Sequence, residues 1–308
     1  MSAGTGTAIV VSAVAAATPL VYAALGELVA ERAGVLNLGV EGMMLVGAIG
    51  GFAVGLSTGS LWLAFLAAAL AGALVSLLFA FLTLTLQTNQ VATGLALTLF
   101  GVGLSAFVGR SFVGLPIARV PQLHIPLLAD LPFFGPLLFQ YDLPEYLSIA
   151  LCAAIAWMLA RSRIGLRLRA VGESPETAHE LGHPVMRIRY LAVLFGGAMS
   201  GIAGAYLSTA LTPMWVEGMS AGRGWIALAL VVFGTWKPWR ALGGAYLFGV
   251  VTVLQLYAQS LGIEVPSEFL SMLPYGVTIA VLVVICRNPK TILLNRPASL
   301  GRSFHAGS

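Results

Sequence analysis

The chain has 308 residues, of which 58% are hydrophobic and only 9% are charged. Soluble globular proteins carry roughly 25% charged residues, so this composition excludes a water-soluble fold over most of the length. Lys and Arg number 16 against 12 Asp and Glu, and most of the basic residues lie beside apolar segments. That distribution is typical of membrane topology and argues against a nucleic-acid partner. The sequence therefore indicates a protein that is embedded in a lipid bilayer.

Long apolar segments follow one another along the chain, and each approaches the roughly 20 residues that a bilayer-crossing helix needs. They are 8–28, 34–56, 61–86, 91–110, 144–160, 190–211, 241–262 and 269–286. A shorter segment, 222–235, is interrupted by Gly234 and precedes the basic residues Lys237 and Arg240. We predict an all-α, polytopic membrane protein of about 8–10 transmembrane helices, forming a single domain over residues 1–308. Segments 34–56 and 222–235 could each be broken or re-entrant.

The basic residues also predict the orientation of the chain in the membrane. If 222–235 crosses, residues 161–189 and the tail 287–308 fall on one side together with Arg32, and the positive-inside rule makes that side cytoplasmic. The N-terminus then lies outside, and its first apolar segment is a retained span because no basic region precedes it. Residues 111–143 form an external stretch in which five prolines oppose a continuous helix.

The stretch 161–189 contains the most specific local signal. Within it, Ser174 suits a helix N-cap, Pro175 suits the first helical position, and Gly182 suits the end of the helix. Ala178 and Leu181 share one face of this short helix, as docking into a groove on a partner requires. We interpret the segment as a docking element for a cytoplasmic partner. This favours a transporter subunit that is driven by another protein.

Polar residues inside the apolar segments are the candidates for a translocation path. Asn37 and Glu41 lie four residues apart, on one face if the segment is a continuous helix. A charged group near the bilayer centre is costly and should face protein or water, so this pair predicts either a path-lining face or an internal brace. Glu217 and Arg223 could form an ion pair near the outer mouth, and Trp225 could stack on a planar ligand.

Two further patterns leave alternatives open. Residues 87–90 form either a tight cytoplasmic turn, which is favoured, or a polar entry to the path. Trp215, Trp236 and Trp239, like Trp225, could stack on a ligand, but an interfacial aromatic belt is the default for tryptophans near span ends.

The sequence does not favour an enzyme. The Walker A phosphate loop is absent. Residues 179–183 (HELGH) and 218–222 (GMSAG) match the strings HExxH and GxSxG, but a GxSxG nucleophile needs a strand-to-helix turn that the predicted all-α chain does not offer. His179 and His183 are four residues apart, but they lack the further ligands that a metal site needs. We expect no catalytic residue, metal or cofactor on this chain, and no ATP site of its own.

Four segments carry a resemblance to a known family. They are ERAGVLNLGVEGMMLVGA (31–48), GLRLRAVGESPETAHELGHPVMRIRYLAVLFGGAMSGIAGAYLS (165–208), MSAGRGWIALALVVFGTWKP (219–238) and MLPYGVTIAVLV (272–283). In this order they resemble the inner-membrane permease subunits of bacterial ABC importers, in the group that serves ribose-type sugars and branched-chain amino acids. Within that group the chain is most similar to nucleoside permeases.

The resemblance implies a type II importer in the bacterial plasma membrane. The permease would pair with a second, often paralogous, permease subunit in a heterodimer, with cytoplasmic ATPases that bind ATP and Mg²⁺, and with an external substrate-binding lipoprotein. It implies that the ATPase-coupling helix is about Ser174–Gly182, with Glu173, Pro175, Ala178 and Gly182 as its recognisable positions. The alternatives are an ABC permease for a simple sugar or another small polar metabolite, and, in a different class, an ATP-independent channel or secondary transporter. That second class gives no reason for the capped helix.

Overall fold

The structure is a computed structural model, and it describes residues 3–123, 135, 139–260, 266–286 and 295–305. Over these residues the chain is helical apart from loops and three isolated β-bridges. The helices are α1 (Ala3–Arg32), α2 (Val40–Thr58), α3 (Leu61–Ala80), η1 (Phe81–Thr85), α4 (Gln90–Gly109), η2 (Arg110–Phe112), α6 (Leu143–Arg161), α7 (Arg163–Glu173), α8 (Pro175–Glu180), α9 (Val185–Tyr206), η3 (Leu207–Leu211), α10 (Arg223–Phe233), α11 (Pro238–Ser260) and α12 (Ser267–Cys286). The predicted all-α, polytopic class is confirmed.

Seven of the described helical segments are long and apolar enough to cross a membrane. They are Gly6–Arg32, Val40–Thr58, Leu61–Thr85, Gln90–Phe112, Leu143–Arg161, Val185–Leu211 and Pro238–Gln259. Arg223–Phe233 is a shorter apolar helix, and Met272–Val281 is an apolar stretch within α12. The predicted span 34–56 is broken, because helix α2 begins only at Val40. The residues before it form a loop in which Gly34 has a left-handed φ of 86°.

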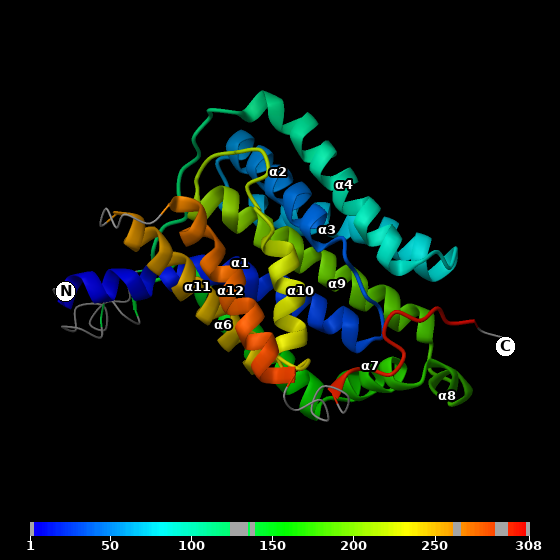
Figure 1. The fold of residues 1–308 in the computed structure, drawn as a ribbon. Helices are drawn as coiled ribbons and strands as arrows, with labels where there is room; N and C mark the ends of the chain where they lie inside the picture. Colours follow the sequence, from blue (N-terminus) through cyan, green and yellow to red (C-terminus); the bar gives the residue numbers. More distant parts are fainter. Residues whose placement is uncertain (1–2, 124–134, 136–138, 261–265, 287–294, 306–308) are drawn as a thin grey trace.

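Helix α9 occupies the middle of the bundle. It packs against α1, α2 and α3, while α4 lies against the far side of α2 (Figure 1). On the other side, α11 packs along α1 and is followed by α12. The short helices α7 and α8 lie together at one end of the bundle, near the last described residues of the chain (Figure 1). The predicted coupling element, α8, contacts α7 and the start of α9.

Close helix contacts in the bundle are made by glycines. A Cβ added to Gly47 would collide with the backbone of Gly201, and one added to Gly72 would collide with the carbonyl oxygen of Gly197. The absence of side chains at these crossings lets α9 approach both α2 and α3 at backbone distance. Such small-residue contacts are the usual means of packing helices in a bilayer, where no hydrophobic force drives the helices together.

The connections at the helix ends settle two of the open sequence patterns. Gln87 has a φ of 56° in the turn after η1, and the side chain of Asn89 caps α4 by accepting a hydrogen bond from the N–H of Ala92 at 3.0 Å. The chain therefore turns at 87–90, as favoured, and the cytoplasmic position of this turn stays a prediction. The belt interpretation is wrong for Trp215 and Trp236, which are 1% and 2% exposed. Trp215 lies against Gly109, a close approach that the sequence does not reveal.

The end of the bundle opposite α8 is joined by a buried carboxyl group. Glu145, in the first turn of α6, accepts the backbone N–H of Asp142 at 2.7 Å and the hydroxyl of Tyr206 at 2.9 Å. Just before α6, burial raises the pKa of Tyr141 to about 12 and also raises the pKa of Asp142, where the positive charge of Arg119 opposes the shift. This network fastens α6 to the end of α9.

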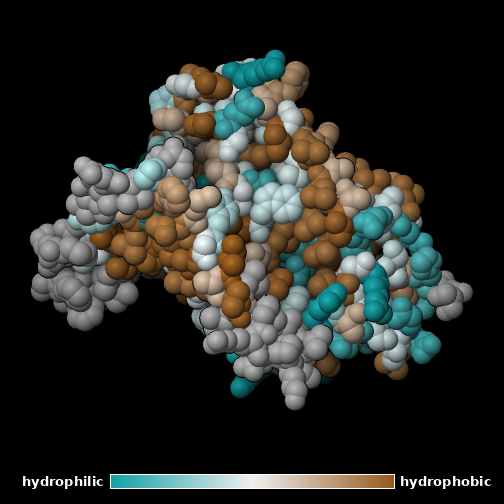
Figure 2. Space-filling view, in the orientation of Figure 1, coloured by the Kyte–Doolittle hydropathy of each residue, from teal (hydrophilic) through white to brown (hydrophobic). Residues whose placement is uncertain are grey.

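The surface shows the same division between apolar bundle and polar end. In Figure 2, hydrophobic residues cover much of the bundle, whereas hydrophilic residues gather at the lower right, over α7 and α8. Large apolar side chains on the bundle are widely exposed, among them Leu99 and Phe107 at 73% and 71%. Exposure of this extent on a soluble protein would mark an interaction surface, and here it fits contact with lipid.

Candidate functional site

The break between α1 and α2 is buried inside the protein. Its residues 33–39 lie between α1 and α4, where the N–H of Leu36 donates to Gln90 Oε1 and the N–H of Asn37 donates to Glu27 Oε1, both at 2.9 Å. Thr98 of α4 donates its hydroxyl to the carbonyl of Leu38 at 3.0 Å. Because loop backbone in an apolar setting needs such partners, these side chains hold the break in one conformation.

Asn37 does not share a helical face with Glu41, contrary to the sequence prediction. It lies in the loop and is fully buried, and its Oδ1 accepts the N–H of Gly39 at 2.9 Å. A shared face requires a continuous helix through both residues. The left-handed conformation of Gly34 and the hydrogen bonds of the loop prevent such a helix. Glu27, which binds the loop from α1, was not singled out from the sequence, and Gln90 was considered only as part of the turn at 87–90. The available signal was a carboxylate pair, Glu27 and Glu31, at the end of the first apolar segment.

Glu41 lies in the first turn of α2 and is 7% exposed. Its Oε1 accepts the hydroxyl of Ser220 at 2.6 Å and the N–H of Gly222 at 2.8 Å, and its Oε2 accepts the N–H of Gly224 at 2.6 Å. The carboxylate therefore binds the first amide groups of α10, where a helix has unpaired donors and a partial positive charge. Of the two alternatives for Glu41, this arrangement is the internal brace.

The other end of α10 is fastened to the end of α1. After Phe233 the chain turns through Thr235 and Trp236, both with positive φ. The indole N–H of Trp236 donates to the carboxylate of Glu31, and Arg32 donates to the Trp236 carbonyl from Nη2 at 2.8 Å. Helix α10 is thus held between two carboxylates, Glu31 and Glu41, that lie on either side of the α1–α2 break.

The remaining candidate path residues lie at the start of α10. Glu217 is exposed, and Arg223 donates from Nη1 to the carbonyls of Met219 and Ser220 at 3.1 and 3.3 Å. The two side chains, both described, do not form the predicted ion pair. The guanidinium of Arg223 is instead hydrogen-bonded to backbone carbonyls of its own segment. Trp225 is 38% exposed.

A tyrosine that sequence reasoning missed lies beside this segment. Tyr275 of α12 is 51% exposed, and its hydroxyl lies 3.5 Å from where a Cβ of Gly222 would be. Tyr275 thus brings a phenol to the start of α10, next to the segment that carries Arg223, whereas Trp225, two residues further along the helix, points to a different side.

The predicted short helix is present as α8, Pro175–Glu180. The hydroxyl of Ser174 accepts the N–H of Thr177 at 3.4 Å and donates to the Thr177 hydroxyl at 2.8 Å. Gly182 ends the helix with a φ of 81°, and its N–H donates to the carbonyl of His179 at 2.8 Å. Both caps lie where the residue types predict them.

The predicted docking face is wrong in one respect. Ala178 is 2% exposed and packs with Val171, Val185 and Phe304, whereas Leu181 is 73% exposed. The phenyl ring of Phe304 also meets the ring of His179, with centroids 5.6 Å apart. Ala178 therefore faces the chain's own tail, which no helical periodicity could reveal. Pro175 is buried as well, while Glu173 is exposed and Ser174 half-buried.

The tail joins α8 to the α1–α2 break through a buried arginine. Arg189, at the start of α9, is 0% exposed and donates to the carbonyls of Ala33 and Arg302 and to the hydroxyl of Ser299, each at 3.1 Å. Ser299 in turn donates its hydroxyl to the carbonyl of Gly172 at 2.7 Å. From the sequence, Arg189 counted only as one of several topology-setting arginines.

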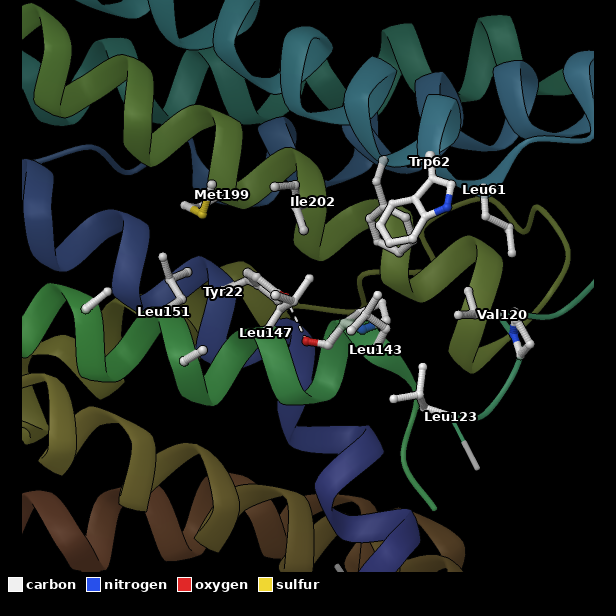
Figure 3. Close-up of a pocket in the computed structure, with 15 residues that line it drawn as sticks. Tyr22, Leu61, Trp62, Val120, Leu123, Leu143, Leu147, Leu151, Met199 and Ile202 are labelled. Atoms are coloured by element: carbon white, nitrogen blue, oxygen red, sulfur yellow. Dashed lines mark hydrogen bonds between the residues drawn. The ribbon is translucent and has the colours of Figure 1, made fainter. Parts of the chain in front are cut away.

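The cavity shown in Figure 3 is not suited to a polar solute. It measures about 540 Å³ and lies between α1, α3, α6 and α9 and residues 120–123. Its lining is almost entirely hydrocarbon, and the hydroxyl of Tyr22, which reaches it, donates to the Pro144 carbonyl at 2.7 Å. Figure 3 shows Leu147, Leu151 and Met199 directed into the space.

Comparison with known proteins identifies the family. Residues 9–282 match the family model described as "Branched-chain amino acid transport system / permease component". The chain is 44% identical over 95% of each chain to "Putative glucose ABC transporter permease protein TsgC13" of Haloferax volcanii. It is 36% identical to the nucleoside ABC transporter permease protein NupC of Lactococcus lactis, over 87% of this chain and 88% of NupC. The guanosine ABC transporter permease protein NupQ of Bacillus subtilis is 34% identical, over 86% of this chain and 88% of NupQ.

No solved structure matches the chain significantly. The family match covers most of the length and includes the α1–α2 break, α8 and α10. The matches to the relatives named above, which are all named as ABC transporter permeases, cover nearly the whole length of those proteins as well. The chain therefore belongs to the ABC transporter permease family that is represented by this permease-component model.

Proposed function

We propose that this chain is the membrane-spanning permease subunit of an ATP-driven importer in the plasma membrane. It binds a cytoplasmic ABC ATPase through α8, pairs with a paralogous permease subunit, and receives its solute from an external substrate-binding lipoprotein. ATP and Mg²⁺ belong to the ATPase, and this chain contributes the path and the coupling. Residues 161–189 and the C-terminus lie in the cytoplasm, with the N-terminus outside.

One continuous series of contacts supports this function. Ala178 of α8 packs on Phe304 of the tail, and the tail's Arg302 and Ser299 are bound by Arg189. Arg189 also binds the Ala33 carbonyl at the α1–α2 break, and the break leads directly to Glu41 at the start of α10. A displacement of α8 is thereby linked, through side chains with fixed partners, to the half-length helix that carries Arg223 and Trp225.

The exposed face of α8 defines the partner surface. Glu176, Glu180 and Leu181 are exposed, while Pro175 and Ala178 are turned inward. A groove on the ATPase that receives this face needs an apolar pocket for Leu181 and basic side chains around it. Charge complementarity of this kind favours correct pairing of the subunits.

We propose nucleosides as the solute, with simple sugars as the second candidate. Two relatives named for nucleoside or guanosine transport match over 86–87% of this chain, and the relative named for glucose is 44% identical. Both solute classes are neutral, contain a sugar ring and present several hydroxyl groups. Near the start of α10, Arg223 supplies hydrogen-bond donors and Trp225 and Tyr275 supply aromatic rings, and stacking of such a ring on a base favours a nucleoside.

The experiment is uptake of labelled guanosine and labelled glucose by cells that express the chain with its ATPase, sister permease and binding protein. A variant, Leu181→Ser, removes the exposed apolar side chain of α8. Ile164→Ser, at an equally exposed site on α7, is the matched control. We expect Leu181→Ser to abolish uptake and ATPase co-purification at unchanged membrane levels, and Ile164→Ser to retain both.

Two outcomes would contradict the proposal. Uptake that persists without the ATPase would establish a channel or secondary transporter. Full uptake by the Leu181→Ser variant would refute the proposal that α8 binds the ATPase through this side chain. Competition between the two labelled solutes then decides the solute class, independently of the coupling mechanism.

A further inference from the structure

A groove lies between the end of α1, α7 and the tail, apart from the path and the coupling contacts. It has a volume of about 340 Å³ and is lined by Leu166, Arg169, Ala170 and Glu173 of α7, together with Arg32 and Pro297. The four α7 residues follow the i, i+3, i+4, i+7 pattern and so form one stripe of the helix. Opposite this stripe stand the last residue of α1 and the tail.

The charges in the groove are unequal. The guanidinium of Arg32 is fixed by hydrogen bonds to the carbonyls of Trp236 and Asn295 at 2.8 and 3.1 Å, so its position does not depend on a ligand. Arg169 is exposed and lines the same groove as Arg32. Glu173 provides one negative charge at the far end. Two arginines against one carboxylate leave the groove with a net positive charge.

Helix α7 has the character of a helix that lies on a membrane surface. Leu168 and Val171 face the protein, whereas Ile164 and Leu166 are 66% and 61% exposed beside exposed arginines. Exposed apolar side chains interspersed with arginines suit the boundary between headgroups and water, where basic side chains reach the phosphates and the apolar ones contact the lipid. Helix α7 follows directly after α6, a segment long and apolar enough to cross a membrane, which ends at Arg161. We therefore place the groove at the level of the phospholipid headgroups.

We propose that this groove binds the headgroup of an anionic phospholipid from the adjoining leaflet. Arg32 and Arg169 bind the phosphate, for which the guanidinium fork is suited, and the exposed Leu166 contacts the glycerol and first acyl carbons. Glu173 accepts hydrogen bonds from headgroup hydroxyls, as in phosphatidylglycerol. Basic pockets beside membrane helices bind anionic headgroups in this way. The proposal rests on α7 lying at the membrane surface and does not require a particular solute.

A bound lipid would have a structural consequence. Arg32 already holds the carbonyl of Trp236 at the end of α10, and Arg169 belongs to the helix that leads into α8. A phosphate bridging the two guanidiniums relieves their mutual repulsion and ties α7 to the end of α1. The lipid thus stabilises the same end of the bundle that receives the ATPase.

The test measures lipid binding by the purified full-length chain in detergent. Phosphatidylglycerol and phosphatidylcholine are added separately, and binding is followed by native mass spectrometry and by the shift in melting temperature. The variants are Arg169→Gln and the conservative Arg169→Lys, with Arg167→Gln as the matched control, because Arg167 is an exposed arginine of the same helix that does not line the groove.

We expect phosphatidylglycerol to raise the melting temperature of the wild-type chain more than phosphatidylcholine does. Arg169→Gln should weaken phosphatidylglycerol binding about fivefold, the effect of removing one basic group near an anionic lipid. Arg169→Lys and Arg167→Gln should retain the preference. Equal binding by Arg169→Gln and the wild type, or an equal loss in Arg167→Gln, would overturn the site. The same stabilisation by inorganic phosphate alone would show a soluble anion in place of a lipid, and equal binding of the two lipids would refute the anionic preference.

Discussion

The carboxylate of Glu41 accepts the backbone N–H of Gly224 at 2.6 Å, which joins the first turn of α2 to the first turn of α10. Gly224 is required at this contact, since a Cβ on it would lie 2.6 Å from the backbone of Glu41. Both helices begin inside the protein, where water is not available to satisfy their free amide groups. One side chain of α2 therefore satisfies the first free amide groups of α10. The start of α10 cannot move independently of α2 while this contact persists.

Replacement of Glu41 by Gln tests this brace. The amide group of Gln presents a donor to at least one of the amides that Glu41 accepts, so a buried backbone group is left without a partner. We expect the variant to lose roughly 1–3 kcal/mol of stability and to melt at a lower temperature, with lower uptake as a consequence. Thermal unfolding of the purified chain is the measurement.

The matched control is Glu217→Gln, an exposed carboxylate in the loop before α10, which should melt like the wild type. An unchanged melting temperature for Glu41→Gln together with lost uptake would favour a path-lining role for Glu41.

A second prediction concerns the glycine contact between α9 and α2. A Cβ on Gly204 would collide with the Met44 carbonyl oxygen and with the backbone nitrogen of Ala48. We expect Gly204→Val to destabilise the bundle by about 3 kcal/mol or more, because the backbones must separate. Gly103→Val on α4, where a Cβ meets nothing within 4 Å, is the control. Membrane yield and detergent-solubilised melting curves distinguish the two, and equal behaviour would refute the contact.

Phe304 should be required for the position of α8. It is 6% exposed and covers Ala178, and removal of a buried phenyl ring costs roughly 3 kcal/mol of local packing. We expect Phe304→Ala to increase amide hydrogen exchange in α8 and to reduce solute-stimulated ATP hydrolysis. Arg302→Ala should leave both unchanged, because Arg302 is exposed and its bond to Arg189 uses the backbone carbonyl. Unaltered hydrogen exchange in α8 of the Phe304→Ala variant would show that the tail does not hold α8 in position.

Gly182 sets the direction of the chain at the end of α8, and its replacement tests whether that direction matters for coupling. Its φ of 81° lies in the left-handed region, but a Cβ there meets nothing within 4 Å. The cost of Gly182→Val is therefore conformational, about 1–2 kcal/mol, and we expect ATP hydrolysis to become uncoupled from uptake. Gly182→Asn should be milder, since Asn tolerates this conformation. Parallel assays of hydrolysis and uptake decide the matter, and intact coupling in the Val variant would contradict the prediction.

Local signals in the sequence were sufficient wherever the relevant interactions are local. Apolar length predicted the all-α membrane class, and Ser174, Pro175 and Gly182 predicted α8 with both of its caps, because capping involves residues only a few positions apart. The break before α2 was recognised only as a possibility, from the glycines around Asn37. Its actual form depends on Gln90 and Thr98, which come from another helix.

Contacts between distant parts of the chain were decided by the tertiary structure alone. The sequence placed a charged Glu41 in an apolar segment, but it could not show that the partners are Ser220, Gly222 and Gly224. It gave α8 an apolar face, yet Phe304, more than 100 residues further on, covers half of that face. Composition and capping act along the chain, so they can be read from it. Burial is a property of what packs against a residue, and that is determined only when helices far apart in the sequence come together.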